Sequence, residues 1–174
     1  RSISIFPPFS WAFLMISMLL FGSGGKAARF GESEVRPMGR AARGVRGISL
    51  KKGKWVVPLI IADTEAADSF VPTATANGYG KRTPLAEYPR HKRGGQGVIA
   101  IQASPRNGSL VCANLVRDED EVMLITTAGT LIRMRVGEIS VVGRNTQGVR
   151  LIELEKKEKL VGIEKVAESA NGDE

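Results

Sequence analysis

Basic side chains on a glycine-rich backbone are the residues of this chain best suited to chemistry. The clearest case is Arg90–Gly97, "RHKRGGQG", where three cationic side chains and an imidazole lie beside three glycines. Such loops bind phosphate groups, because exposed backbone amides and positive charges both favour an anion. An ordinary turn with solvated basic side chains is the alternative. The segment alone leaves both interpretations open.

The chain shows no set of residues suited to catalysis or to a metal site. His91 and Cys112 are the only histidine and cysteine, too few for a zinc site made of protein ligands. Paired carboxylates occur only in "DEDE", Asp118–Glu121, where a solvated turn is the default. The glycines form neither a Walker loop nor a dinucleotide fingerprint. Cys112 and Trp55 lie in apolar runs, and we predict that both belong to the core.

The charge is unevenly placed along the 174 residues. The formal net charge is +7 and the isoelectric point about 9.9. Residues 26–106 hold 15 basic and 6 acidic side chains, whereas residues 107–174 hold 9 and 12. The basic part favours an anionic partner such as nucleic acid or a membrane surface. The acidic end is expected to compete with that partner.

The chain repeats itself three times. The Gly-Val pairs that begin at Gly44, Gly97 and Gly148 lie 53 and 51 residues apart. Each pair belongs to a set of seven positions that agree in all three copies without gaps. Besides these pairs, the set contains a leading glycine (Gly25, Gly78, Gly129), an arginine (Arg29, Arg82, Arg133), a glutamate (Glu34, Glu87, Glu138), a second arginine (Arg40, Arg93, Arg144) and an isoleucine (Ile48, Ile101, Ile152).

A period near 50 with short apolar segments is typical of propeller-like blades. We therefore predict an all-β, propeller-like array of about three four-stranded blades, in a partial chain. Hairpin turns are expected at Asn77-Gly78 and Ala128-Gly129. Each Gly-Val pair should launch a half-buried strand, "GVRGISL", "GVIAIQA" or "GVRLIEL". The predicted blades are residues 18–70, 71–121 and 122–166, followed by an acidic tail, 167–174, and preceded by an apolar leader, 1–17.

The apolar leader has no clear role. Residues 3–21 are similar to the core of a signal peptide, but Pro7 and Pro8 interrupt them and only Arg1 precedes them. A membrane-tethered β domain is one interpretation. We favour non-native or truncated sequence before a first strand at Met18–Phe21, and expect no membrane partner.

The repeats resemble the C-terminal domain of the DNA gyrase A family over Met18–Val166. The resemblance is carried by "GYGKRTPLAEYPRHKRGGQGVIAI", "AGTLIRMRVGEISVVGRNTQGVRLI" and "VRPMGRAARGVRGI". It implies a β-pinwheel, of which this chain would supply the last three blades and the tail. "HKRGGQG" is similar to the gyrase-A box of that family, but it lacks the first Gln and has Gln96 where the box has Lys. The corresponding family of topoisomerase IV is the nearest relative.

The resemblance also implies a function. The family domain binds and wraps DNA around a basic rim, which supports negative supercoiling by a type II topoisomerase. The expected partners are double-stranded DNA, the rest of gyrase A and the gyrase B protein, in the bacterial cytoplasm at the nucleoid. No catalytic residue is assigned, and ATP and magnesium would belong to regions absent here. The alternative is a protein-interaction propeller whose basic rim binds an acidic protein.

Phosphate contacts would be independent of sequence, because backbone phosphates carry no base information. For the repeated arginines the alternative is a structural role, such as pairing with the glutamate of the same repeat. We predict DNA contacts from ten residues: Arg40, Arg43, Arg46, Lys81, Arg82, Arg90, Lys92, Arg93, Arg133 and Arg144.

Overall fold

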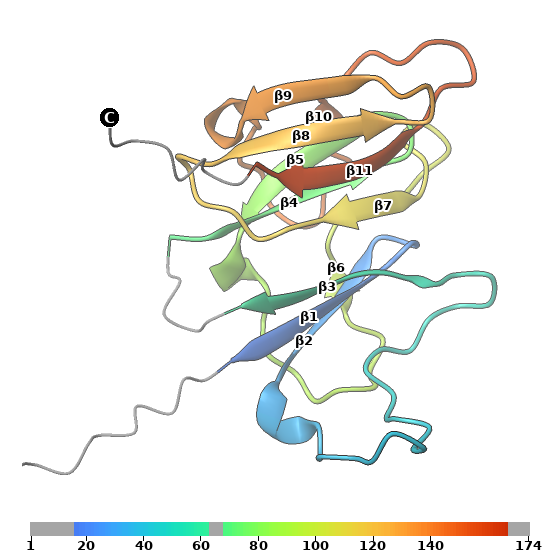
Figure 1. Cartoon of the computed structure of the whole chain (residues 1–174), viewed down its shortest axis with the longest axis vertical. Helices are drawn as coiled ribbons and strands as arrows, with labels where there is room; N and C mark the ends of the chain where they lie inside the picture. The colour runs from blue at the N-terminus through green and yellow to red at the C-terminus, as the bar shows by residue number, and fades with distance from the viewer. Residues whose placement is uncertain (1–15, 63–67, 167–174) are drawn as a thin grey trace, which may run out of the picture.

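The computed structural model describes residues 16–62 and 68–166, which form three antiparallel β-sheets (Figure 1). Residues 1–15 of the predicted leader and the whole predicted acidic tail, 167–174, therefore lie outside the described residues. The all-β prediction is confirmed, with two sheets of four strands and one of three. The division of the sequence into blades at fixed boundaries stays a prediction.

Each sheet is built around one hairpin. The first has the order β3-β1-β2-β6, the second β10-β5-β4-β7 and the third β11-β8-β9. The strands of the first are β1 (Ser17–Gly22), β2 (Lys26–Gly31), β3 (Val56–Ala62) and β6 (Val98–Ile99). Those of the second are β4 (Phe70–Thr75), β5 (Tyr79–Pro84), β7 (Leu110–Ala113) and β10 (Val149–Arg150). The third contains β8 (Glu121–Thr126), β9 (Leu131–Arg135) and β11 (Leu160–Lys165). A 3-10 turn follows each hairpin: η1 (Glu32–Glu34), η2 (Leu85–Glu87) and η3 (Val136–Glu138).

The predicted turn glycines lie at the hairpin tips. Gly78 between β4 and β5 has φ +79°, and Gly129 between β8 and β9 has φ +84°. This left-handed backbone is costly for other residues, so glycine fixes where each hairpin reverses. The alternation of side chains along a strand determines which of them enter the core. In β1, Leu19 and Phe21 are fully buried, while Leu20 between them is half-buried.

The fourth strand of the first two sheets comes from the following repeat. In β6, Val98 pairs with Ala27 of β2, and in β10, Val149 pairs with Gly80 of β5. A sheet and a sequence repeat are therefore different sets of residues. The strand predicted for "GVRGISL" is not found, because residues 44–50 pair with no strand in the described part of the chain.

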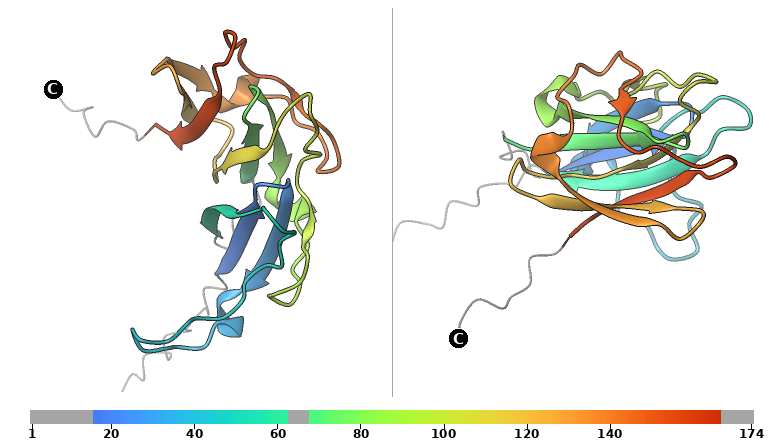
Figure 2. Two further views of the ribbon diagram at one scale, coloured as in Figure 1. Left: turned by 90° about the vertical axis from the view of Figure 1, so that its right-hand side faces the viewer. Right: turned by 90° about the horizontal axis from the view of Figure 1, so that it is seen from above.

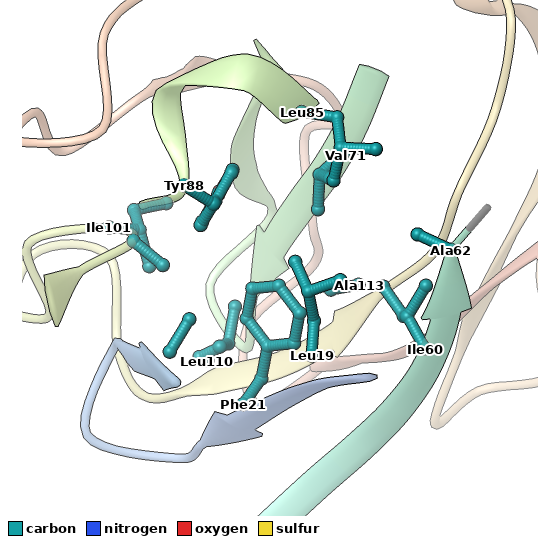
Figure 3. Packing of buried hydrophobic residues seen from close by; sticks show 12 residues of the cluster. Leu19, Phe21, Ile60, Ala62, Val71, Leu85, Tyr88, Ile101, Leu110 and Ala113 are labelled. Carbon is teal, nitrogen blue, oxygen red and sulfur yellow. The ribbon is translucent and has the colours of Figure 1, made fainter. Parts of the chain in front are cut away.

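Two apolar cores hold the sheets face to face. Between the first and second sheets, Leu19, Phe21 and Leu110 pack with Tyr88 and Ile101, as Figure 3 shows. The rings of Phe21 and Tyr88 meet edge to face, with centroids 5.9 Å apart. The links between sheets are thus apolar as well as backbone-mediated.

Two residues were predicted to belong to the core, Cys112 and Trp55, and the structure confirms this for Cys112 alone. Cys112 packs with Val122, Leu124 and Leu160 between the second and third sheets, as predicted. The prediction that Trp55 belongs to the core is wrong, because this residue is 60% exposed. It is the last residue before β3.

The sheets follow an arc. In Figure 2 (left), β3, β7 and β11 lie along the inner side of the arc, where β7 contacts both of the others. The segments that lead into β6 and β10 lie along the outer side. Among the described residues, no helix has the length and apolar character that spanning a bilayer requires.

Candidate nucleic-acid interface

We call residues 35–50, 88–97 and 139–148 the rim loops. The second and third lie along the outer side of the arc, and the first lies at the lower end of the arc in Figure 2 (left). Each contains a positive-φ glycine at the predicted position: Gly44 (+77°), Gly97 (+68°) and Gly148 (+77°). A Cβ at Gly97 would collide with the carbonyl oxygen of Ala27, and a Cβ at Gly148 with that of Gly80. Positive φ and close approach of chains therefore both require glycine at these two positions.

The first repeated arginine bridges consecutive repeats. Arg29 Nη1 donates to the carbonyls of Leu85 (3.0 Å) and Tyr88 (3.1 Å), which belong to the next repeat. Arg82 Nε likewise donates to the carbonyl of Ile139 at 2.7 Å. Neither arginine forms an ion pair with the glutamate of its own repeat, so that alternative does not hold among the described residues.

Arg82 is unsuited to a DNA contact. Its side chain is 9% exposed, forms an ion pair with Asp118 and lies over the ring of Phe70, 4.6 Å from the centroid. Arg133 occupies the same repeat position in the third copy. Its side chain is 61% exposed and forms an ion pair with Glu121 on the neighbouring strand. The same residue type thus has two different environments.

The second repeated arginine also holds repeats together. Arg93 donates two hydrogen bonds to Glu34. The backbone N–H of Arg93 donates to the Glu34 carboxylate, and the Arg93 Nε donates to the Glu34 carbonyl, both at 2.9 Å. Arg93 Nη1 donates to the Arg46 carbonyl at 3.2 Å. These contacts tie the second rim loop to the first and account for the side chain without DNA.

Arg144 makes two of these three contacts one repeat later. Its backbone N–H donates to the Glu87 carboxylate at 3.3 Å, and its Nη1 donates to the Ile99 carbonyl at 2.9 Å. The repeated glutamate therefore serves the next repeat rather than its own.

Lys81 is the buried cation of the site. The residue has no exposed surface, and its Nζ donates to the carbonyls of Gly143 (2.6 Å) and Arg144 (2.5 Å). Burial lowers the pKa of Lys81 to about 8, opposed in part by the nearby Glu87 carboxylate. These two hydrogen bonds attach Lys81 of β5 to the third rim loop. The burial of the Lys81 side chain argues against a phosphate contact.

Five predicted residues remain exposed on the first two rim loops: Arg40, Arg43, Arg46, Arg90 and Lys92. In the part of the chain that the structure describes, none of their side chains forms an ion pair. The two loops lie side by side, because Gly94 N–H donates to the Gly47 carbonyl (2.6 Å) and Ser49 N–H to the Gly95 carbonyl (2.8 Å). This is where the predicted positive charges gather.

Three further lysines adjoin this cluster and were not predicted. Lys26, Lys51 and Lys54 line a pocket beside the first rim loop, together with Gln96 of the second. None occupies a repeated position. The run "KKGK", residues 51–54, was the sequence signal that could have identified two of them.

Comparisons with known proteins agree with this architecture. The family model described as DNA gyrase C-terminal domain, beta-propeller, matches residues 17–63, 73–113 and 120–167. The A subunit of DNA gyrase from Pseudomonas aeruginosa is 52% identical over 157 residues, which are 90% of this chain and 17% of that protein. Its counterpart from Escherichia coli (strain K12) is 53% identical over 151 residues, 87% of this chain and 17% of that protein. The chain thus spans less than a fifth of the length of these relatives.

Two solved structures share the fold. The structure of the DNA gyrase A C-terminal domain superposes with a TM-score of 0.79 at 26% identity, covering 88% of this chain and 51% of that one. The C-terminal domain of DNA topoisomerase IV superposes with a TM-score of 0.80 at 27% identity, covering 88% and 47%.

Proposed function

The chain belongs to the DNA gyrase C-terminal domain family, and from this premise we propose that its rim binds and wraps double-stranded DNA without sequence preference. The observation that carries the proposal is the cluster of exposed cations on the first two rim loops, Arg40, Arg43, Arg46, Arg90 and Lys92. In the described part of the chain these side chains form no ion pair, whereas four repeated arginines hold consecutive repeats together: Arg29, Arg82, Arg93 and Arg144. Exposed charges on a fixed backbone suit a partner that presents regularly spaced phosphates.

Wrapping requires contacts spread along a curved surface. Bending a short duplex costs about 1–6 kcal/mol, so several dispersed phosphate contacts must offset it. The second and third rim loops follow the outer side of the arc of sheets (Figure 2), and backbone hydrogen bonds join the first rim loop to the second, which supports such a path. In the complete enzyme, wrapping by this domain would set how the duplex crosses itself before strand passage. The rest of gyrase A and gyrase B would supply catalysis, ATP and magnesium, in the bacterial cytoplasm.

The test is the salt dependence of DNA binding by a triple variant, Arg43→Gln, Arg90→Gln and Lys92→Gln. Each phosphate contact contributes about 0.9 to the slope of log affinity against log salt, so loss of three contacts lowers the slope by roughly 2.7. The loss should be the same on duplexes of unrelated sequence, because no base is read. Binding is titrated at several salt concentrations.

The matched control neutralises three exposed cations outside the rim loops, Arg135→Gln, Lys156→Gln and Lys157→Gln. It removes the same net charge, so a general effect of charge would change both slopes alike. An unchanged slope in the rim variant, with a native circular dichroism spectrum, would refute the proposal for these loops. Equal losses in the two triple variants would also refute it.

A further inference from the structure

The third rim loop holds little free positive charge. Its only cationic side chain is that of Arg144, whose Nη1 is already hydrogen-bonded to a backbone carbonyl at 2.9 Å. A duplex that continues past the second rim loop therefore needs cations from neighbouring segments. Two arginines adjoin the third rim loop. Arg150 follows its last residue by two positions, and Asn107, the neighbour of Arg106, donates a hydrogen bond from Nδ2 to the Gln147 carbonyl at 3.1 Å.

Arg106 and Arg150 converge on the ring of Tyr79, and we call these three residues the Tyr79 cluster. The Cζ atoms of Arg106 and Arg150 lie 4.9 and 5.6 Å from the centroid of the ring. Arg150 Nη2 also donates a hydrogen bond to the Tyr79 hydroxyl at 3.2 Å. The hydrogen bond from Arg150 lowers the pKa of the Tyr79 phenol, and Arg106 lowers it further. One buried ring thus brings two exposed guanidinium groups together.

The backbone fixes where the two arginines lie. The side-chain amide of Asn77, at the tip of the second hairpin, donates to the Arg106 carbonyl at 2.9 Å. Arg150 belongs to β10 and is the pairing partner of Tyr79 in β5. The two arginines therefore come from different repeats and meet where the second repeat joins the third.

The Tyr79 cluster lies away from the ends of the described segments. In Figure 1 the hairpin tips lie at the right, whereas the start of β1 and the ends of β3 and β11 lie at the left. Tyr79 directly follows the glycine at the tip of the second hairpin. Both repeats that form the cluster belong to the described part of the chain at this junction.

The positive charges of the Tyr79 cluster are only partly offset by acidic groups. Arg106 forms no ion pair among the described residues. Arg150 lies 3.6 Å from the Glu153 carboxylate, but both side chains are exposed, and an exposed ion pair is weak. Two like charges at one ring repel each other, so an anion between them is favoured. Guanidinium groups bind phosphate through paired N–H donors, which makes phosphate the anion of matching shape.

The junction between the first and second repeats also gathers cations beside a hairpin tip. Lys26 has the place in the first hairpin that Tyr79 has in the second, directly after the hairpin glycine. It lines a pocket together with Lys51 and Lys54 of the same repeat and Gln96 of the next. Positive charge thus lies beside the hairpin tip at both junctions, although different residues supply it.

We propose that Arg106 and Arg150, held against Tyr79, together bind one phosphate group. Wrapped DNA supplies this phosphate at the point where the duplex passes from the second rim loop to the third. That assignment rests on the function proposed above, whereas the site itself does not, because free phosphate has the same chemistry. The experiments below distinguish the two sources.

The salt dependence of duplex binding counts the phosphates that the cluster neutralises. The double variant Arg106→Gln, Arg150→Gln should lower the slope of log affinity against log salt by about 0.9, because both arginines serve one phosphate. Two separate phosphate contacts would lower it by about 1.8. The matched control, Arg117→Gln with Arg135→Gln, removes the same charge from exposed residues at the opposite end of the third sheet and should leave the slope unchanged.

A titration with inorganic phosphate tests the site without DNA. The Nε–Hε resonances of Arg106 and Arg150 are followed by nuclear magnetic resonance and assigned by their loss in the single variants Arg106→Gln and Arg150→Gln. Both should shift in a saturable way with phosphate, and more than with sodium chloride at equal ionic strength. The triple rim variant reports on the proposed function separately, because it leaves Arg106 and Arg150 in place.

The two experiments together decide the proposal. A slope lowered by about 0.9 in the double variant, with an unchanged slope in the control, identifies the duplex as the source of the phosphate. An unchanged slope with saturable phosphate shifts identifies free phosphate as the ligand. An unchanged slope without saturable shifts overturns the proposal. A slope lowered by about 1.8, or lowered equally in the control, overturns it as well.

Discussion

Arg82 and Arg133 form a natural matched pair for measuring what the contacts between consecutive repeats contribute to stability. They occupy the same repeat position, but Arg82 is buried against the next repeat and Arg133 is exposed. Changing each to alanine removes the same side chain from two environments. We expect the free energy of unfolding to fall far more for Arg82→Ala than for Arg133→Ala.

The magnitude follows from the contacts. Arg82→Ala removes the donors to the carbonyls of Ile139 (2.7 Å) and Gly137 (3.4 Å). Leaving a buried carbonyl without a partner costs about 1–3 kcal/mol, and the weaker second contact contributes less. Loss of the cation–π contact with Phe70 adds about 0.5–1 kcal/mol. The expected total is therefore about 3 kcal/mol. For Arg133→Ala the exposed ion pair predicts about 0.2–1 kcal/mol.

Urea unfolding, followed by circular dichroism, measures both values. A loss of about 3 kcal/mol corresponds to a fall in melting temperature of about 6–12 °C for a chain of this length. Equal losses for the two variants would refute the conclusion that Arg82 holds consecutive repeats together, as would a loss for Arg82→Ala below about 1 kcal/mol.

Two further predictions concern buried titratable groups. The pKa of Lys81 is lowered to about 8 from 10.5, so between these values the unfolded chain binds more protons than the folded chain. The free energy of unfolding should therefore rise with pH in that window, and Lys81→Met should remove this part of the rise; a wild-type curve parallel to that of the variant would contradict the prediction. Burial raises the pKa of the Cys112 thiol to about 12, so a thiol reagent should label it only after unfolding, and rapid labelling of the folded chain would contradict its place in the core.

The sequence identified positions better than it identified contacts. The glycines at Gly78 and Gly129 predicted two hairpin tips, because a preference for positive φ is a property of a single position. The strand order was not predictable in the same way. A repeat establishes that Gly97 and Gly148 are equivalent, but not that the strand after each one pairs with the preceding repeat instead of its own.

The contacts of the repeated arginines and glutamates also could not be predicted from their positions in the sequence. Pairing of an arginine with a glutamate of its own repeat is the simplest interpretation of their spacing. Arg93 instead contacts Glu34, 59 residues earlier, through the backbone and through the glutamate carboxylate. Arg82 reaches Ile139, 57 residues later. Such contacts depend on how one sheet stacks on the next, which the spacing within a repeat does not contain.

The distinction between repeated and unrepeated cations has a physical reason. The contact between one sheet and the next has the same geometry each time, so it needs the same donor at the same place, and its arginines must recur. A phosphate contact needs only positive charge at the rim, because the duplex offers a phosphate along its whole length. Arg43, Arg90 and Lys92 satisfy that requirement without any repeat counterpart of the same kind. For this chain, the cations that break the repeat are thus better candidates for DNA than the ones that define it, and the triple rim variant tests three of them.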